Sequence, residues 1–387
     1  MIPATSLAQE LKITVTNPSA MARANEPVVV SWATIAKQLP RASATTVQLT
    51  DEQGRPFRVQ VDDLNLDGTL DELTFVADFA SKQQRSFTLA VVSGESLTSR
   101  QEPFRTDAAD WKRINGVLQS VDDDDVPGSG RDRRLYRFDG VGWESDVVAY
   151  RLYLDERNAV DIQGKRKPGL YWKYIGISGV DYQQDADWGM DVLHVGPALG
   201  LGGIGFWVGD SVLKPVKLDR LRCRIVARGP VRAVVRVDYY GWELDEGKVD
   251  VTSLFTIYAG DRVSEHQVIL QGAKSAKTIA TGIVKHTAGI RHWNPQGTWL
   301  YTLGPQSRAN DGLLMALHIP QSTLVKKVED EYNHLLLLQL ERTRPVRFFL
   351  SSVWQGESGT MWTEAEIESF LERTSLRLNQ PLTVDLR

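Results

Sequence analysis

The sequence predicts a mainly β protein built around a large antiparallel β-sandwich. Apolar and polar residues alternate along much of the chain: in the run 231–240, Val231 and Val235 fall on one face and Arg232 and Arg236 on the other. A period of two residues is typical of a half-buried antiparallel strand. Helical periodicity is rare in the chain, and many long strands with few helices favour two packed sheets.

The composition excludes several classes of protein. The 387 residues are 42% hydrophobic and 24% charged, which is ordinary for a globular chain with one large core or two domains. The net charge of -4 gives no reason to expect nucleic acid or a membrane as partner. Eleven Trp and eleven Tyr suit β cores and also stacking on sugar rings. The single cysteine, Cys223, excludes an internal disulfide.

Residues 10–105 predict a small N-terminal β-sandwich, because short alternating runs recur there at hairpin spacing. The expected strands are Lys12–Thr16, Pro27–Trp32, Thr46–Thr50, Phe57–Val61, Thr74–Ala77 and Ser86–Val92. Met1–Gln9 ends in Ser-Leu-Ala before Gln9, which resembles the small-residue end of a trimmed signal peptide. We therefore expect a periplasmic or secreted protein.

Residues 106–134 predict an irregular region. The acidic run Asp122–Asp125 and the Pro, Gly and Ser residues after it are typical of a solvated loop, which in an open cleft can also contact a ligand.

Residues 135–387 predict the large sandwich that carries the active cleft. Its expected strands are Leu135–Phe138, Val147–Leu154, Cys223–Ala227, Val231–Tyr240, Val249–Tyr258, Val263–Leu270, Thr278–Lys285, Trp299–Leu303, Leu313–His318, His334–Glu341 and Val346–Val353. One helix is expected after Thr363, because Thr363–Glu366 fits a capping box. Two or three other short helices are possible.

The segment Asp187–Trp207 combines an acidic and aromatic start with a glycine-rich end. Between Gly196 and Gly209 no residue is charged and six of fourteen are glycine. Closely spaced glycines indicate tight turns or close backbone approach. The segment is thus either a sugar-binding floor or a buried β-arch with glycines at its bends.

The loop Asp63–Asp71 has the spacing of a short calcium loop. Asp63, Asn65 and Asp67 alternate, Gly68 permits a sharp turn, and Asp71 closes the sequence. The bidentate Glu of an EF-hand is absent. The loop is therefore either a structural Ca²⁺ site or an Asx-rich turn without metal. No organic cofactor is expected, because the chain has neither a Walker A motif nor a dinucleotide-binding motif.

Two short segments concentrate groups that could carry chemistry. The first, KHTAGIRHW, contains His286, Arg291, His292 and Trp293, and clustered titratable groups mark sites only probabilistically. A lone histidine is more often structural, which is how we interpret His318 and His334.

The second segment is a cationic, aromatic loop, QGKRKPGLYWKY, which contains Lys165, Arg166, Tyr171 and Trp172 and which we group with Arg151. Cations beside aromatic rings suit an anionic sugar, although exposed Lys and Arg usually only solubilise a protein.

Several segments together resemble a known family. EPVVV (26–30), DLNLDGTLDEL (63–73), WESDVVAYRLY (143–153), DWGMDVLHVG (187–196), GLGGIGFW (200–207), GPVRAVVRVDYYGW (229–242) and TGIVKH (281–286) occur in an order that resembles the bacterial DUF4861 family. The resemblance implies an exported protein of polysaccharide utilisation, acting on uronate-containing oligosaccharides, including removal of water from a terminal uronate. It also implies a β-supersandwich similar to that of galactose mutarotase-like proteins.

The leading hypothesis is a uronate dehydratase or lyase. A base takes the proton next to the carboxylate, cations neutralise the developing charge, and an acid protonates the departing oxygen. The candidate base is His286 or His194, and the candidate acid is Tyr171 or His292. The candidate carboxylate clamps are Arg151, Lys165 and Arg166, and the candidate sugar contacts are Trp172, Asp187, Trp188, Asp191, Arg291 and Trp293.

Two alternatives stay open. Asp187 and Asp191 could be the acid and base of a glycoside hydrolase, since the separation of paired carboxylates is invisible in sequence. The chain could also be a sugar-binding module without catalysis. In each case the expected partner is an acidic oligosaccharide, bound by a monomer or dimer.

Overall fold

The computed structural model describes residues 10–92, 103–126, 131–132, 134–175, 181–293, 298–320, 323–359 and 362–387. The signal-like Met1–Gln9 lies outside the described residues. The chain forms two compact units. The small unit comprises Met1–Arg105, Gly229–Arg232 and Leu376–Arg387, and the large unit comprises Thr106–Arg228 and Ala233–Ser375.

The small unit holds two antiparallel sheets and one short helix, α1 (Trp32–Gln38). The five-stranded sheet has the order β29 (Thr383–Leu386), β1 (Glu10–Thr16), β7 (Gln84–Val91), β3 (Val47–Asp51) and β4 (Pro56–Phe57). The three-stranded sheet has the order β2 (Arg23–Ser31), β6 (Glu72–Phe79) and β5 (Gln60–Asp62). Alternate residues such as Ile13, Phe75 and Leu89 form a core of their own.

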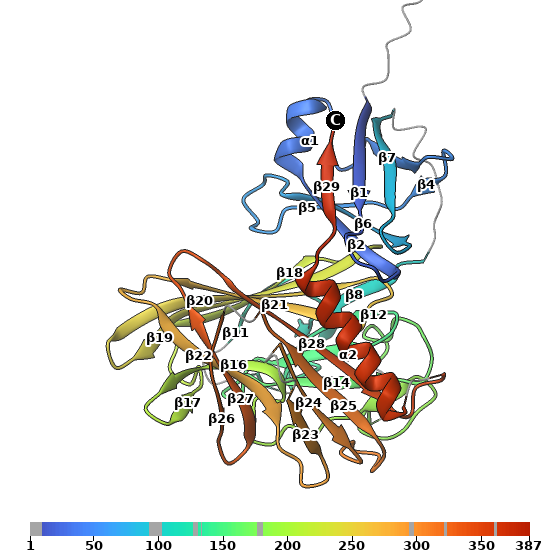
Figure 1. Ribbon diagram of the computed structural model, residues 1–387. Helices are drawn as coiled ribbons and strands as arrows, with labels where there is room; N and C mark the ends of the chain where they lie inside the picture. The colour runs from blue at the N-terminus through green and yellow to red at the C-terminus, as the bar shows by residue number, and fades with distance from the viewer. Residues whose placement is uncertain are drawn as a thin grey trace, which may run out of the picture. The chain divides into compact units, whose positions relative to one another are not determined.

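The large unit is dominated by a nine-stranded antiparallel sheet (Figure 1). Its order is β11 (Asp123–Val126), β18 (Arg220–Ala227), β19 (Arg232–Leu244), β20 (Gly247–Tyr258), β21 (Ser264–Gln271), β28 (Val346–Trp354), β25 (Leu313–His318), β24 (Trp299–Gly304) and β23 (Ile290–Trp293). Two five-stranded sheets complete the sandwich. The first has the order β15 (Gly189–Asp191), β14 (Val160–Lys165), β13 (Ala149–Tyr153), β12 (Gly140–Ser145) and β8 (Thr106–Ala109). The second has the order β17 (Ser211–Leu213), β16 (Leu201–Val208), β22 (Lys277–Val284), β27 (Asn333–Leu340) and β26 (Leu324–Glu329).

One apolar core joins the nine-stranded sheet and the two five-stranded sheets of the large unit. It contains Ile162 of β14, Val251 of β20 and Ile283 of β22, all at most 1% exposed. Trp143 packs on Phe255 with ring centroids 4.5 Å apart and donates its indole N–H to Ser264 at 2.9 Å. This mainly β, sandwich-type fold is the one that the sequence predicts.

The helix α2 (Glu364–Asn379) confirms the predicted capping box. The Thr363 amide donates to the Glu366 carboxylate at 2.9 Å, and the Glu366 amide donates back to the Thr363 hydroxyl at 3.3 Å. Ile367 and Leu371 of α2 pack on β24, β25 and β28, across which α2 lies in Figure 1. Neither α1 nor α2, the two α-helices of the described residues, has the length and hydropathy that a membrane-spanning helix needs.

Three local predictions differ from the structure. No strand covers 135–138, where Tyr136 forms only an isolated bridge to Lys112. The region 106–134 contains β8, β9 (Trp111–Ile114), β10 (Val117–Ser120) and β11 instead of only irregular chain. The acidic run forms β11 because its exposed carboxylates pair with arginines across the ladder to β18. The residues 376–387, expected in the large sandwich, belong to the small unit because β29 pairs with β1.

The glycine-rich segment is a buried strand, as the second of the two alternatives for it states. Leu201, Ile204 and Phe206 of β16 lie in the main core. A Cβ on Gly200, whose φ is +68°, would lie 1.9 Å from the carbonyl oxygen of Val160. The glycine lets β16 approach β14, so the glycine-rich end of the segment is buried and offers no sugar-binding floor.

Candidate active site

The sheet formed by β8 and β12–β15 has one apolar face and one polar face. Tyr150, Leu152 and Ile162 point into the main core. The intervening residues of the same strands are charged or polar and are nevertheless buried. We call this second surface the polar face; it comprises Glu144, Arg151, Asp161, Gln163, Lys165 and Asp191. Because buried charges are costly unless paired, so dense a set points to a functional surface.

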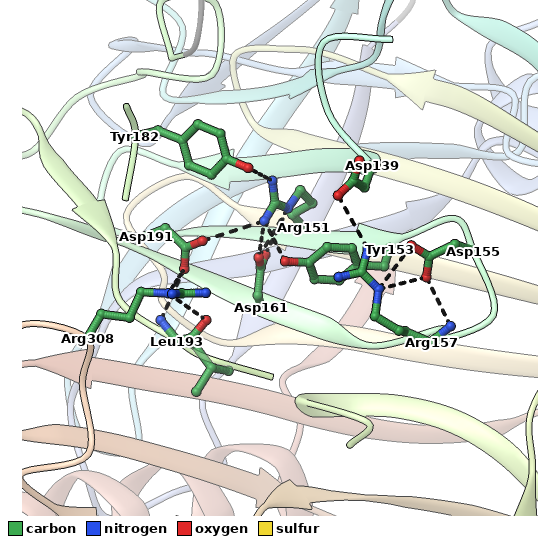
Figure 2. Close-up of polar contacts among 10 residues, drawn as sticks. All are labelled: Asp139, Arg151, Tyr153, Asp155, Arg157, Asp161, Tyr182, Asp191, Leu193 and Arg308. Atoms are coloured by element: carbon green, nitrogen blue, oxygen red, sulfur yellow. Dashed lines mark hydrogen bonds and ion pairs between the residues drawn. The ribbon is translucent and has the colours of Figure 1, made fainter. Parts of the chain in front are cut away.

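Arg151 lies at the centre of the polar face (Figure 2). Its side chain is 1% exposed, and its guanidinium donates to both carboxylate oxygens of Asp161. It also donates to the hydroxyls of Tyr153 at 2.8 Å and Tyr182 at 3.3 Å. The Oδ2 of Asp191 lies 3.6 Å from the same guanidinium. One cation therefore faces two buried carboxylates.

Asp191 is the carboxylate that this arrangement perturbs. Burial, and next the negative charge of Asp161, raise the pKa of Asp191 to about 7. Its Oδ1 accepts the backbone N–H of Leu193 at 3.2 Å, whereas its buried Oδ2 has no hydrogen-bond partner among the described residues. Asp191 thus exchanges a proton close to neutral pH, a property typical of catalytic groups.

Arg308 lies beside Asp191 and Leu193. Its Nε lies 3.4 Å from the Asp191 Oδ1 and donates to the Leu193 carbonyl at 3.3 Å. Figure 2 shows the Arg308 side chain reaching Asp191 from a separate stretch of chain. The side chain is 23% exposed, and no contact with another described residue occupies its two terminal nitrogens. Arg308 therefore pairs with Asp191 through Nε and leaves its two terminal nitrogens for a further carboxylate.

His286 is held as a neutral base beside Arg308. Its Nε2 lies 3.0 Å from the carbonyl oxygen of His194, and a carbonyl only accepts, so Nε2 carries the proton. Burial lowers the pKa of His286, the hydrogen bond to the His194 carbonyl opposes this shift, and the charge of Arg308 lowers the pKa further. The Nδ1 of His286 is consequently unprotonated at neutral pH, while the His194 side chain is exposed. We call Asp191, His194, His286 and Arg308 the His–Arg cluster.

The structure contradicts the predicted clamp roles of Arg151 and Lys165. Lys165 is buried and donates to Glu144 at 2.5 Å, to the Gly169 carbonyl at 2.7 Å and to the Ser145 carbonyl. All three ammonium protons are used, and Asp161 neutralises Arg151 in the same way. Neither cation has charge or exposed surface left for a substrate carboxylate.

The Glu144–Lys165 pair shapes the loop that covers the polar face. The carboxylate of Glu144 accepts the backbone N–H groups of Tyr171 at 2.8 Å and Trp172 at 2.9 Å. Burial raises the pKa of Glu144 and lowers that of Lys165, while their mutual attraction opposes both shifts. The pair therefore anchors the loop residues rather than a ligand.

The other predicted sugar contacts divide between buried and accessible positions. Trp172 is 0% exposed and packs on Gly142, where a Cβ would lie 2.3 Å from the indole. Tyr171 and Trp188 are partly exposed, with ring centroids 6.1 Å apart. Arg166 lies over Trp354 at 5.0 Å and forms a bidentate ion pair with Asp185.

The predicted histidine segment does not form one site. His292 lies on β23 and stacks on Tyr301 at 4.5 Å, with an angle of 4° between the rings. Arg291 pairs with Glu329, which also lies 2.9 Å from Lys285. Trp293 contacts Lys327 at 4.5 Å. No contact between described residues joins His292 on β23 to His286.

The loop 63–71 is an Asx-rich turn. The Asp63 carboxylate accepts the backbone N–H groups of Leu66 and Gly68, each at 2.7 Å, and Asn65 accepts that of Asp67 at 2.8 Å. The Asp71 carboxylate closes the loop by accepting the amide of Leu64 at 2.7 Å. Among the described residues, no group of three or more His, Cys, Asp or Glu gathers as metal ligands would. Calcium binding here stays a prediction.

Sequence reasoning missed four residues of the site. Glu144, Asp161 and Gln163 alternate with apolar residues in WES and VDIQGK, so period-two alternation could have placed them on one face. Arg308 lies in the loop GPQSRANDG, which carries no such signal. Asp187, a predicted site residue, is exposed and lies outside the buried network.

Comparisons with known proteins give a family and a fold. A solved structure of an alpha-mannosidase from Enterococcus faecalis superposes with a TM-score of 0.51 at 10% identity, covering 98% of this chain and 46% of that one. A protein in glycosyl hydrolase family 38 from Enterococcus faecalis gives a TM-score of 0.48 at 8% identity, covering 98% of this chain and 47% of that one. The chain thus spans about half the length of these proteins. No curated protein sequence matches the chain. The family described as "Domain of unknown function (DUF4861)" matches residues 15–384, and this protein belongs to it.

Proposed function

We propose that this protein is a carbohydrate-active lyase that eliminates water or a glycosyl group from a uronate residue of an acidic oligosaccharide. The observation that carries the proposal is the His–Arg cluster. It combines the two terminal guanidinium nitrogens of Arg308 with a neutral imidazole on His286. These are the two groups that elimination next to a carboxylate requires.

In the proposed reaction Arg308 pairs with the uronate carboxylate. The Nδ1 of His286 takes the proton from the carbon next to that carboxylate, and the negative charge spreads onto the carboxylate that Arg308 neutralises. The carbon–oxygen bond at the neighbouring carbon then breaks, and a carbon–carbon double bond forms. The departing oxygen takes up a proton and leaves as water or as the hydroxyl of the released sugar.

We assign the proton for the departing oxygen to His194, whose side chain is exposed and whose backbone carbonyl contacts His286. Tyr171, the acid suggested by the sequence, donates its hydroxyl to the Lys167 carbonyl at 3.3 Å. Its ring and that of Trp188 are better placed in our proposal as stacking surfaces for a neighbouring sugar. His292 has no part in the reaction.

The test is incubation with a panel of uronate-containing oligosaccharides, followed by ultraviolet absorbance of the new double bond and by mass spectrometry. A rise with loss of one water indicates a dehydratase, and a rise with chain shortening indicates a lyase. His286→Ala should lower the rate by roughly 10²–10⁴-fold. Arg308→Met should lower it on the order of 10²–10³-fold, with Arg308→Lys in between.

Matched controls come from the same chain. His292→Ala removes a histidine that stacks on Tyr301 on a different strand, and Arg373→Met removes an exposed cation of α2. Both variants should keep the wild-type rate. Full elimination activity in His286→Ala would show that the base assignment is wrong.

A glycoside hydrolase is the second candidate. The observation that favours it is the pKa of Asp191, raised to about 7 by burial, which suits a general acid. Saturated, shorter products without ultraviolet absorbance would support hydrolysis. Export to the periplasm or beyond remains part of our proposal, because an extracellular polysaccharide is the natural source of such a substrate.

A further inference from the structure

Arg137 lies outside the His–Arg cluster and is a buried cation without a counter-ion. None of its three guanidinium nitrogens has measurable exposure or a hydrogen-bond partner among the described residues. The guanidinium carbon lies 4.8 Å from the centroid of the Phe138 ring and 5.2 Å from that of Trp111. Burial lowers the pKa of Arg137 to about 10, so the side chain stays charged at neutral pH.

Two further donors in the aromatic cluster around Phe138 lack hydrogen-bond partners among the described residues. The indole N–H groups of Trp111 and Trp172 are buried and have no acceptor among the described residues. Trp172 meets Phe138 edge-on at 5.1 Å, and Trp111 packs in the same aromatic cluster. Guanidinium and indole nitrogens cannot accept hydrogen bonds, so these groups cannot satisfy one another.

The position of Arg137 is fixed by its backbone. Its amide donates to the Trp111 carbonyl at 3.1 Å, and the Arg113 amide donates to the Leu135 carbonyl at 2.6 Å. The segment 135–137 therefore runs along β9 and holds the guanidinium between two rings. Cation–π contact offsets only part of the free energy that burying an unpaired ion costs.

We propose that this aromatic cluster is an oxyanion-binding site in which Arg137 pairs with a carboxylate or a tetrahedral oxyanion. The oxygen atoms of an anion would accept hydrogen bonds from the Arg137 guanidinium and from the indole N–H groups of Trp111 and Trp172. A guanidinium binds carboxylates and tetrahedral oxyanions alike through its paired N–H donors. The oxyanion is either a free inorganic ion or an acidic substituent of a saccharide. The site is independent of the elimination reaction proposed above.

The experiment is isothermal titration of the full chain with sodium sulfate, sodium acetate and sodium glucuronate at constant ionic strength. We expect one saturable site per chain. Arg137→Met should weaken binding at least tenfold, and Trp111→Phe, which keeps the ring but removes the N–H, should weaken it severalfold. Arg134→Met is the matched control, because the Arg134 side chain is 88% exposed and pairs with Asp132. It should bind as the wild type does.

The outcomes distinguish a saccharide substituent from a free ion as the source of the oxyanion. Tightest binding of glucuronate assigns the site to a saccharide substituent, whereas binding of sulfate or acetate alone assigns it to a free ion. In buffer without oxyanion, Arg137→Met should melt no lower than the wild type, because it removes an uncompensated charge.

No saturable binding of any probe, or equal binding by Arg137→Met, would overturn the proposal. A strong loss of melting temperature in Arg137→Met without oxyanion would do the same, because it would indicate a purely structural cation. If Arg137→Met does not fold, the affinity of Trp111→Phe for the oxyanion probes tests the proposal instead. None of these results depends on turnover, so failure here and failure of the lyase proposal are distinguishable.

Discussion

Variants of Lys165 and its partner Glu144 test whether this pair on the polar face stabilises the fold or binds substrate. Glu144→Gln would leave the Lys165 ammonium buried with only two carbonyl partners, those of Ser145 and Gly169. Removing one partner of a buried ion pair costs about 3–5 kcal/mol, and we expect that loss in the free energy of unfolding. Lys165→Met should cost a similar amount, because Glu144 would keep its charge and only its backbone donors.

The double variant Glu144→Gln/Lys165→Met should cost less than either single variant. Two neutral side chains leave no uncompensated charge, and Gln retains an oxygen for the backbone N–H groups of Tyr171 and Trp172. The assay is urea unfolding followed by tryptophan fluorescence and near-ultraviolet circular dichroism, with both probes compared because the chain has two units.

The control is an exposed pair in the same unit. Lys217 and Glu243 lie 3.3 Å apart with side chains 74% and 50% exposed, so breaking that pair should cost less than about 1 kcal/mol. If the double variant lost as much free energy of unfolding as the two single variants together, Glu144 and Lys165 would not be energetically coupled. An unchanged stability of Lys165→Met combined with weaker substrate binding would refute the anchoring role and restore the clamp.

Four further predictions follow from single contacts. Burial lowers the pKa of His286, so the acid limb of a pH profile of kcat/KM for elimination should lie below about pH 6.5. His266 lies fully buried with its pKa lowered to about 3, and only the unfolded chain protonates it. Between about pH 6.5 and 4.5 it should therefore remove about 2.3 kcal/mol of stability, measured by urea unfolding at each pH. Gly142→Ala should cost about 1–3 kcal/mol in thermal unfolding, because the new Cβ would meet Trp172 at 2.3 Å. If the predicted calcium loop binds, Ca²⁺ added after chelation should raise the melting temperature, and Asp63→Asn should abolish the rise.

Each of these has an outcome that contradicts it. An acid limb at or above the ordinary histidine value would exclude His286 as the base. A flat stability between the two pH values would mean that His266 titrates in the native state. A Gly142→Ala variant as stable as the wild type would show that the indole moves aside, and an unchanged melting temperature with Ca²⁺ would leave an Asx turn without metal.

The strands were predictable where one face is buried and the other is not. In β18, the buried Cys223 and Ile225 alternate with the partly exposed Arg222 and Arg224, and the predicted strand Cys223–Ala227 falls within β18. The strand β11 was not predictable in the same way. Its residues Asp123, Asp124 and Asp125 read as a solvated loop, and only the arginines of β18, about 100 residues later, make the exposed carboxylates fit a ladder.

The site was predictable in part for the same reason. Arg151, Lys165 and Asp191 were singled out from the sequence, and all three lie on the polar face, but their burial and pairing depend on Asp161 and Glu144 in register on neighbouring strands. A substrate clamp and a buried ion pair use the same residue types, so sequence alone could not separate them.

The pairing of β29 with β1 has a consequence for the order in which the chain can fold. The small unit begins to emerge from the ribosome with β1, yet the partner on that edge of β1 is synthesised only after the whole large unit. During synthesis β1 therefore presents an open edge, which is a template for wrong pairing. The last strand to be made is also the one that removes this hazard, so completion of the first unit reports that the second has been synthesised.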